Sequence, residues 1–193
     1  NFTSATDTYN VAIGENAGTA VTTGVANILI GGLTGDALTD ADYNTAIGHQ
    51  ALSTDTLGSR SVALGYFALR NQNFTSATNS YNTALGFAAG EAITTGVQNT
   101  LIGGLAGDAN TTGANNTTLG YLSLTANTTG SGNVALGKAA LESNTTADNN
   151  TAVGKDTLRL NTTGHSNTAV GSLSGDAITT GAGNTAVGLG SLS

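Results

Sequence analysis

The chain has 193 residues, of which 9% are charged, and it contains no Cys, Met, Trp or Pro. Its net charge of −7, with five basic residues, argues against a nucleic-acid surface, which needs clustered Lys and Arg to replace the counterions of phosphates. No run has the length and apolarity of a membrane span, and the small residues, 28 Gly among them, favour a thin core over a compact one.

From Tyr9 onward a short phrase ending in glycine returns along the chain, as in VAIG, ILIG, TAIG and later TAVG. Successive closing glycines are 17 residues apart, except for one gap of 21 between Gly65 and Gly86. A fixed period of this kind predicts a stack of similar units, here about eleven over one continuous array that spans residues 1–193. The closing glycines are Gly14, Gly31, Gly48, Gly65, Gly86, Gly103, Gly120, Gly137, Gly154, Gly171 and Gly188.

A four-residue insertion near residues 70–80 accounts for the longer gap. It lies in RNQNFTSATNS, and similar words, NFTSATDTYN, occupy residues 1–9 and the position after them. A second period of 72 residues therefore overlies the first, which indicates duplication of a block of four units.

Each unit predicts a short strand followed by a corner. NTAVG suits a strand of about four residues that ends at glycine, and the LxxNTTG half suits a second strand or an Asn/Gly corner. Two or more Gly per unit, with β-branched residues between them, disfavour helix. We therefore predict an all-β solenoid, a β-roll or β-helix, in which each unit is one rung that pairs its backbone with the rungs above and below at about 4.8 Å.

The residue before each closing glycine is always a branched aliphatic one. Because strand side chains alternate in direction, we predict that this column points into the coil as a continuous core and that the column before it points outward. The outward column would be an apolar strip that a parallel oligomer buries, and we favour a homotrimer over a single-chain coil with scattered surface Ala. The inward column would be Ile13, Ile30, Ile47, Leu64, Leu85, Ile102, Leu119, Leu136, Val153, Val170 and Val187; the outward one would be Ala12, Leu29, Ala46, Ala63, Ala84, Leu101, Thr118, Ala135, Ala152, Ala169 and Ala186.

Two further positions of the unit exchange bulk. Four residues after the closing glycine the unit has either Leu, as at Leu52, or Gly, as at Gly35. Units with Gly carry a bulky apolar residue three places later, such as Leu38, where Leu-type units tend to have Asn. We predict that the two positions share one pocket, and that Leu105 compensates in the unit of Gly107, which lacks the later residue.

The Asn and Thr columns are predicted to form ladders of hydrogen bonds along the stack. In each Thr-Thr pair, one side chain should bond along the stack and the other should face water. An ordered Thr array could also bind ice or the hydroxyl lattice of a polysaccharide, which is the alternative function. The column concerned is Thr22, Thr94, Thr111, Thr128, Thr145, Thr162 and Thr179, each followed by a second Thr.

No catalytic, cofactor or metal site is predicted, and we do not expect an enzyme. His49 and His165 follow no catalytic pattern and occupy different unit positions, so we interpret them as surface or turn residues. The glycine pairs at Gly31 and Gly103 lack the GK[ST] sequence and helix of a phosphate loop. Three recurrent acids in GDA turns supply too few oxygens for calcium and are interpreted as turn formers; they are Asp36, Asp108 and Asp176.

Aromatic residues gather around the insertion, and Asn-x-Thr sequons recur with the repeat. We expect the aromatic residues to pack the lengthened loop against the rod, with an adhesive patch as the alternative; they are Tyr66, Phe67, Phe74, Tyr81 and Phe87. Because the repeat itself spells NTT, the sequons are weak evidence for glycosylation. They start at Asn1, Asn73, Asn110, Asn115, Asn116, Asn127, Asn144, Asn149 and Asn161.

The phrases NTALG, NTAVGKDTLRLNTTG and KAALESNTTADNNTAVG resemble the seventeen-residue NTAIGxxALxxNTTG repeats of bacteriophage tail-fibre and bacterial surface-fibre proteins. The NxAIG core is also similar to the shorter head repeats of trimeric autotransporter adhesins of the YadA type. The resemblance implies a parallel homotrimeric β-roll or β-helix with a structural or adhesive role, outside the cell or on the virion. We accordingly expect a rigid fibre segment that self-associates, end to end into filaments as a variant, and that contacts a cell-surface glycan or receptor.

Overall fold

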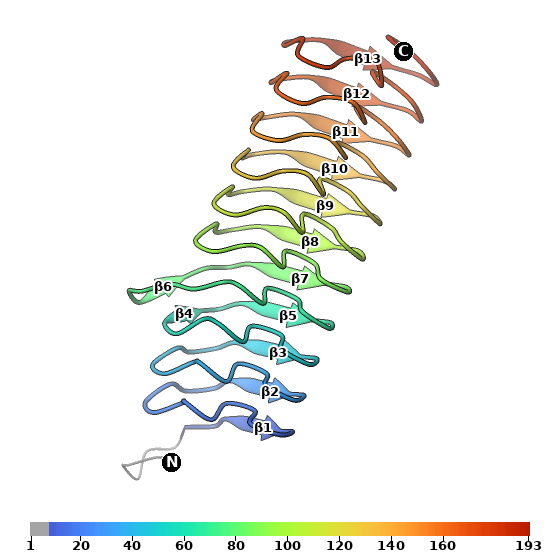
Figure 1. Cartoon of the computed structure of the whole chain (residues 1–193). Helices are drawn as coiled ribbons and strands as arrows, with labels where there is room; N and C mark the ends of the chain where they lie inside the picture. Colours follow the sequence, from blue (N-terminus) through green and yellow to red (C-terminus); the bar gives the residue numbers. More distant parts are fainter. Residues whose placement is uncertain (1–7) are drawn as a thin grey trace.

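The computed structural model describes residues 8–193, which form a rod of stacked coils (Figure 1). Every coil contributes one short strand to the same side of the rod. In chain order the strands are β1 (Val11–Ile13), β2 (Ile28–Ile30), β3 (Thr45–Ile47), β4 (Gly58–Ser59), β5 (Val62–Leu64), β6 (Thr78–Asn79), β7 (Thr83–Leu85), β8 (Thr100–Ile102), β9 (Thr117–Leu119), β10 (Val134–Leu136), β11 (Thr151–Val153), β12 (Thr168–Val170) and β13 (Thr185–Val187).

The strands pair in parallel, each with its neighbours in the stack. One sheet contains eleven of them in the order β1-β2-β3-β5-β7-β8-β9-β10-β11-β12-β13. Equivalent residues of successive units face one another, as Ala135 faces Ala152 and Leu136 faces Val153. The predicted all-β parallel solenoid is thus confirmed, and residues 8–193 contain no helix.

Backbone hydrogen bonds between coils continue beyond the strands. Leu141 N donates to Thr157 O at 3.0 Å, and Thr128 N donates to Thr145 O at 2.8 Å. The LxxNTTG half is therefore a corner, although its amides still bond along the rod. A second strand pair forms only beside the insertion, where β4 pairs with β6.

The predicted direction of the strand side chains is wrong. From Leu29 onward the central strand residue is buried in every coil, as for Ala135 at 0% exposure, whereas the aliphatic residue before the closing glycine faces outward, as for Leu119 at 53%. The inward column is therefore Leu29, Ala46, Ala63, Ala84, Leu101, Thr118, Ala135, Ala152, Ala169 and Ala186. Small residues suit this position because the coil is thin and larger side chains enter the core from the opposite segment.

The shared pocket is confirmed. Leu52, Leu69, Leu124, Leu141 and Leu158 are fully buried, and so are Leu38 and Ile93 of the Gly-type units. A Cβ built on Gly35 would lie 2.9 Å from Leu38 Cδ1 and 2.8 Å from Leu29 Cδ2, so those side chains occupy the space that Leu fills elsewhere.

In the unit of Gly107 the predicted compensation by Leu105 is wrong. The three atoms nearest a Cβ built on Gly107 all belong to Leu101, the central residue of β8, at 3.0 to 3.7 Å. Leu105 lies only half-buried. The volume missing from the turn is therefore supplied by the strand.

An Asn ladder runs through the interior beside the strands and confirms the prediction. Asn133 is fully buried; its Nδ2 donates to Ala147 O at 2.8 Å, and its Oδ1 accepts a bond from Asn150 N at 3.0 Å. A second ladder joins Asn110, Asn127, Asn144 and Asn161, whose Nδ2 atoms donate to the Oδ1 of the preceding unit at 3.0 to 3.1 Å. Buried amides here satisfy one another and the backbone, which makes their burial affordable.

The closing glycine is required by close approach of the backbone. Gly137 has a φ of +137°, and a Cβ there would lie 2.4 Å from Gly154 O in the next coil. The corresponding glycines repeat this arrangement up the rod, so a side chain at this position would separate two coils.

The insertion enlarges one corner and buries a polar cluster. Asp55 is fully buried and accepts bonds from Gly58 N at 3.0 Å, Phe74 N at 3.1 Å and Gln72 Nε2 at 2.6 Å. Phe74 is also buried and packs over this corner beside Gly58, as predicted for the aromatic residues of the insertion. The similar segment at residues 1–9 lies largely outside the described residues.

Candidate functional site

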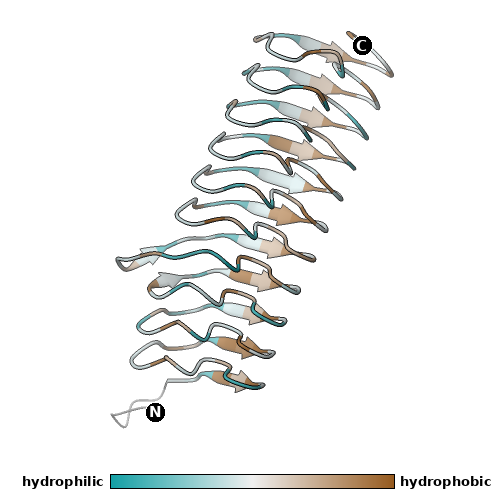
Figure 2. Cartoon of the chain, in the orientation of Figure 1, coloured by the Kyte–Doolittle hydropathy of each residue, from teal (hydrophilic) through white to brown (hydrophobic). Residues whose placement is uncertain are grey.

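Two exposed surfaces differ sharply in chemistry, and the first is the outer surface of the long sheet. We call it the strand face; it consists of the first and third residues of each strand. Figure 2 shows apolar colour running up this side of the rod. Neither column contains a charged residue. The first column is Val11, Ile28, Thr45, Val62, Thr83, Thr100, Thr117, Val134, Thr151, Thr168 and Thr185, and the third is the aliphatic column that ends at Val187.

The second surface, which we call the turn face, consists of the first, second and fifth residues after each closing glycine. These positions vary from unit to unit, and eleven of the 17 charged residues (five basic plus twelve acidic) occupy them. The eleven are Glu15, Asp36, Arg70, Glu91, Asp108, Lys138, Glu142, Lys155, Asp156, Arg159 and Asp176. The turn face therefore carries most of the chemical variety of an otherwise repetitive chain.

An aromatic stack lies on the turn face of three successive coils. The rings of His49 and Tyr66 are stacked with centroids 5.4 Å apart, and those of Tyr66 and Phe87 are stacked at 5.6 Å. Phe67 lies beside Tyr66, and the Arg70 guanidinium lies 4.2 Å from the Phe67 ring centroid. Tyr66 and Phe87 are exposed, so the prediction that the aromatic residues pack the inserted loop holds for Phe74 and is wrong for this stack.

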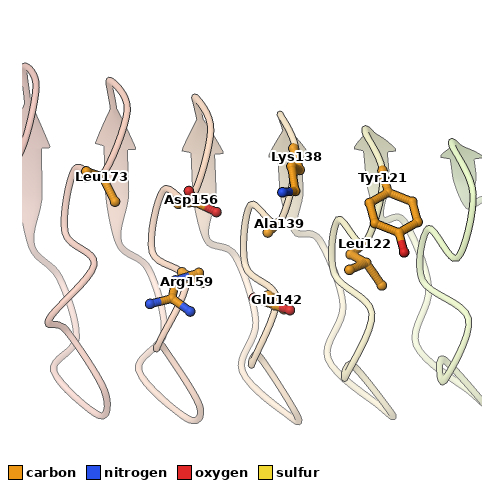
Figure 3. A pocket seen from close by; sticks show the side chains of 8 residues that line it. All are labelled: Tyr121, Leu122, Lys138, Ala139, Glu142, Asp156, Arg159 and Leu173. Carbon is orange, nitrogen blue, oxygen red and sulfur yellow. The ribbon is translucent and has the colours of Figure 1, made fainter.

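A groove of about 310 Å³ lies farther along the turn face (Figure 3). Its residues come from the same turn of four successive coils, those of β9 to β12. It is lined by Tyr121, Leu122, Lys138, Ala139, Glu142, Asp156, Arg159 and Leu173. Nothing in the repeat phrase points to this groove; the signal that could have found it is the concentration of charged residues at the variable positions.

The histidines lie apart, in agreement with the surface interpretation. His49 belongs to the aromatic stack, and His165 is exposed with its Nδ1 3.2 Å from Ser166 Oγ. Within residues 8–193 no three His, Cys, Asp or Glu side chains gather as a metal site, and no helix there is long and apolar enough to cross a membrane. Gly31 and Gly103 close strands and precede no helix.

The three recurrent acids lie on the turn face, one to a coil. Asp108 Oδ1 accepts a bond from Thr125 of the next coil. Asp36 Oδ1 is buried without a hydrogen-bond partner, and burial raises the pKa of this carboxyl above its usual range, with a smaller opposing effect from a backbone hydrogen bond. Isolated carboxyls of this kind cannot enclose a cation, which agrees with their interpretation as turn residues.

The Thr pairs divide as predicted. The first Thr donates along the stack, as Thr128 Oγ1 does to Thr145 O at 3.1 Å. The second Thr is exposed, and five of these residues follow one another without interruption: Thr112, Thr129, Thr146, Thr163 and Thr180. Half of the Thr hydroxyls are therefore committed to the backbone, and the other half form a row open to solvent.

Most sequons belong to the interior ladders. Asn110, Asn116, Asn127, Asn144 and Asn161 are fully buried, so no glycan fits on them in the folded protein. Of the other described sequons, Asn115 and Asn149 are exposed and Asn73 is half-buried. The Asn1 sequon lies outside the described residues. The repeated NTT is thus explained by structure.

The geometry defines the class of protein as a parallel β-solenoid of 17-residue repeats. No protein-family model, curated protein or solved structure matches the chain. The functional argument therefore depends on the two surfaces.

Proposed function

We propose that this chain is a structural fibre segment of a phage tail fibre or a bacterial surface adhesin, acting outside the cell as a rigid rod that contacts other surfaces. The observation that carries the proposal is the charge-free strand face along all eleven strands of the sheet. A rod of about 50 Å by the spacing of strands suits a spacer. The resemblance of the repeat to tail-fibre and adhesin repeats supports the same assignment.

The strand face suits association with further copies of the chain. Exposed apolar side chains occur at each end and in the middle of the rod, as at Ile13, Leu85, Leu119 and Val187, with exposures of 59%, 41%, 53% and 68%. Such a continuous patch on a monomer marks an interaction surface. In a parallel homotrimer the two columns of one copy would each meet a different neighbour, Thr and Val against Ile and Leu, along a common axis.

Lysine on the strand face should abolish this association. We expect the double variant Leu85→Lys/Leu119→Lys to keep the circular dichroism spectrum of the wild-type protein, since both side chains are exposed in the single chain, and to sediment as single chains. The reason is that each lysine would have to be buried without a partner. Sedimentation velocity and native mass spectrometry count the chains.

The matched control is Leu160→Lys, since Leu160 has the same 41% exposure as Leu85 but lies outside the strand face. It should leave the assembly intact. A wild-type protein that remains monomeric at high concentration would contradict the proposed association. Electron microscopy separates the variant in which rods join end to end, because it would show filaments in place of discrete short rods.

The alternative function, binding of ice or a polysaccharide lattice by a Thr face, is favoured by the exposed row from Thr112 to Thr180. Its members repeat once per coil, at about 4.8 Å, so they present an ordered set of hydroxyls. Thermal hysteresis of the wild-type protein, with binding to insoluble polysaccharide measured in parallel, tests it. Negative results in both would remove this alternative.

A further inference from the structure

The groove on the turn face exists because a column of side chains changes size there. The second residue after the closing glycine is Leu122, then Ala139, Asp156 and Leu173 in successive coils. Ala139 is 4% exposed and forms the floor, whereas the two leucines form apolar ends. Tyr121, with 52% of its surface exposed, stands beside the floor at one end (Figure 3).

The polar side chains of the groove are free to bind a ligand. Within residues 8–193 the side chains of Lys138, Glu142 and Arg159 take part in no ion pair, although their charges are opposite and they lie in neighbouring coils. Only Asp156 is paired, with Lys155 Nζ 3.2 Å from its Oδ2. The groove thus offers hydrogen-bond donors and acceptors side by side, with two basic and two acidic groups that balance in charge.

We infer that this groove binds an uncharged oligosaccharide. Sugar hydroxyls donate and accept hydrogen bonds at once, so they can use carboxylate acceptors and the Arg and Lys donors together. The apolar C–H surface of a pyranose ring fits against the exposed Tyr121 ring and the Leu walls. A nucleic acid is a poor fit because Glu142 and Asp156 would repel its phosphates.

This inference deepens the proposed surface-contact role and depends on it. The turn face is separate from the strand face, so the groove would remain accessible in an assembly built through the strand face. A rod with one groove in every copy would bind multivalently, which strengthens attachment to a glycan-covered surface without new contacts.

The test is a steric block in the full chain. Leu occupies the Ala139 position in other coils, at Leu122 and Leu173, with the same left-handed backbone (φ of 58° and 57°, against 55° for Ala139). Ala139→Leu should therefore fold and fill the groove floor. Gln50→Leu is the matched control, because Gln50 lies at the same unit position with φ of 54° in a coil remote from the groove.

The probe is an array of immobilised neutral oligosaccharides, namely glucans, galactans and N-acetylglucosamine oligomers, with sialylated and sulfated glycans and an oligonucleotide beside them. We expect the wild-type protein to bind at least one neutral oligosaccharide, and titration calorimetry with that sugar to show affinity reduced about tenfold or more by Ala139→Leu and by Arg159→Ala, which removes a donor. Gln50→Leu should bind as the wild-type protein does.

Three outcomes would overturn the inference. They are no binding to any neutral glycan, binding that Ala139→Leu leaves unchanged, or binding confined to anionic probes and lost in about 0.5 M salt, which screens charge contacts at distances beyond a few ångströms. Sedimentation of the same variants separates this failure from that of the proposed rod. Groove variants should assemble normally, whereas strand-face variants should lose assembly and still bind the sugar as single chains.

Discussion

Gly137→Ala is expected to divide the rod into two parts that unfold separately. The new Cβ would lie 2.4 Å from Gly154 O and 2.6 Å from Gly154 C, a distance that forces the coils of β10 and β11 apart. Its φ of +137° is also unfavourable for any L side chain. We expect a loss of at least about 4 kcal/mol, in the range reserved for severe core defects.

Each strand contacts only the strands next to it in the stack, so a defect between two coils interrupts the cooperativity of the rod. Urea unfolding followed by circular dichroism should show two transitions. In hydrogen exchange, amides that cross the defect should lose protection first, such as Gly154 N, which donates to Leu136 O at 2.8 Å, and Leu141 N, which donates to Thr157 O at 3.0 Å.

Gly183→Ala is the matched control for this prediction. Gly183 also has a positive φ, of +71°, but a Cβ there meets no atom within 4 Å. The same substitution then costs only the backbone strain, about 1 to 2 kcal/mol. Equal destabilisation by the two variants would show that close approach of the coils is not the reason for the closing glycine.

Asn133→Ala is expected to be the most damaging substitution of a side chain in the ladder. It removes the donor to Ala147 O and the acceptor for Asn150 N, at 2.8 and 3.0 Å, in a position with 0% exposure. Each unpaired buried group costs about 1 to 3 kcal/mol, so we expect a loss of about 3 kcal/mol or more in urea unfolding. Asn115→Ala is the control, because Asn115 is exposed and Ala26 occupies the same unit position with a similar φ of 55°.

Asn133→Asp separates hydrogen bonding from packing. The ionised carboxylate would face Ala147 O and Asn116 Oδ1, which are both acceptors, where the amide now donates at 2.8 and 3.2 Å. Burial raises the pKa of such a carboxyl in the folded state above its unfolded value, so stability should rise as the pH falls toward the unfolded pKa and decline as it increases through the folded pKa. A variant whose stability does not change with pH would contradict the ladder as the source of the loss.

The repeat was predicted well because its constraints are local and recur in every unit. Eleven glycines at fixed spacing could be read directly, and the structure explains them by the approach of one backbone to the next. The exchange between Leu52-type and Leu38-type residues was also visible, because one pocket must hold a constant volume and both positions vary inside one chain.

The inward face of the strand was mistaken because alternation fixes which residues share a face and leaves open which face is inside. Hydrophobicity favoured the Val, Ile and Leu column. A signal for the correct choice was present: the strand centres that carry Leu, Leu29 and Leu101, belong to units with glycine four residues after the closing glycine, Gly35 and Gly107. Bulk on the strand and bulk on the turn exclude each other, since both point into the same narrow interior.

The sequence by itself determined the period, the parallel register, the corner glycines and the Asn and Thr ladders, because each follows from one unit and its copy 17 residues away. Only the tertiary structure decided that alanine lines the core and that the larger aliphatic side chains face outward. It also brought Tyr121, Ala139 and Arg159 to one groove, since the coil diameter and the alignment of variable positions across several coils depend on how whole units pack together.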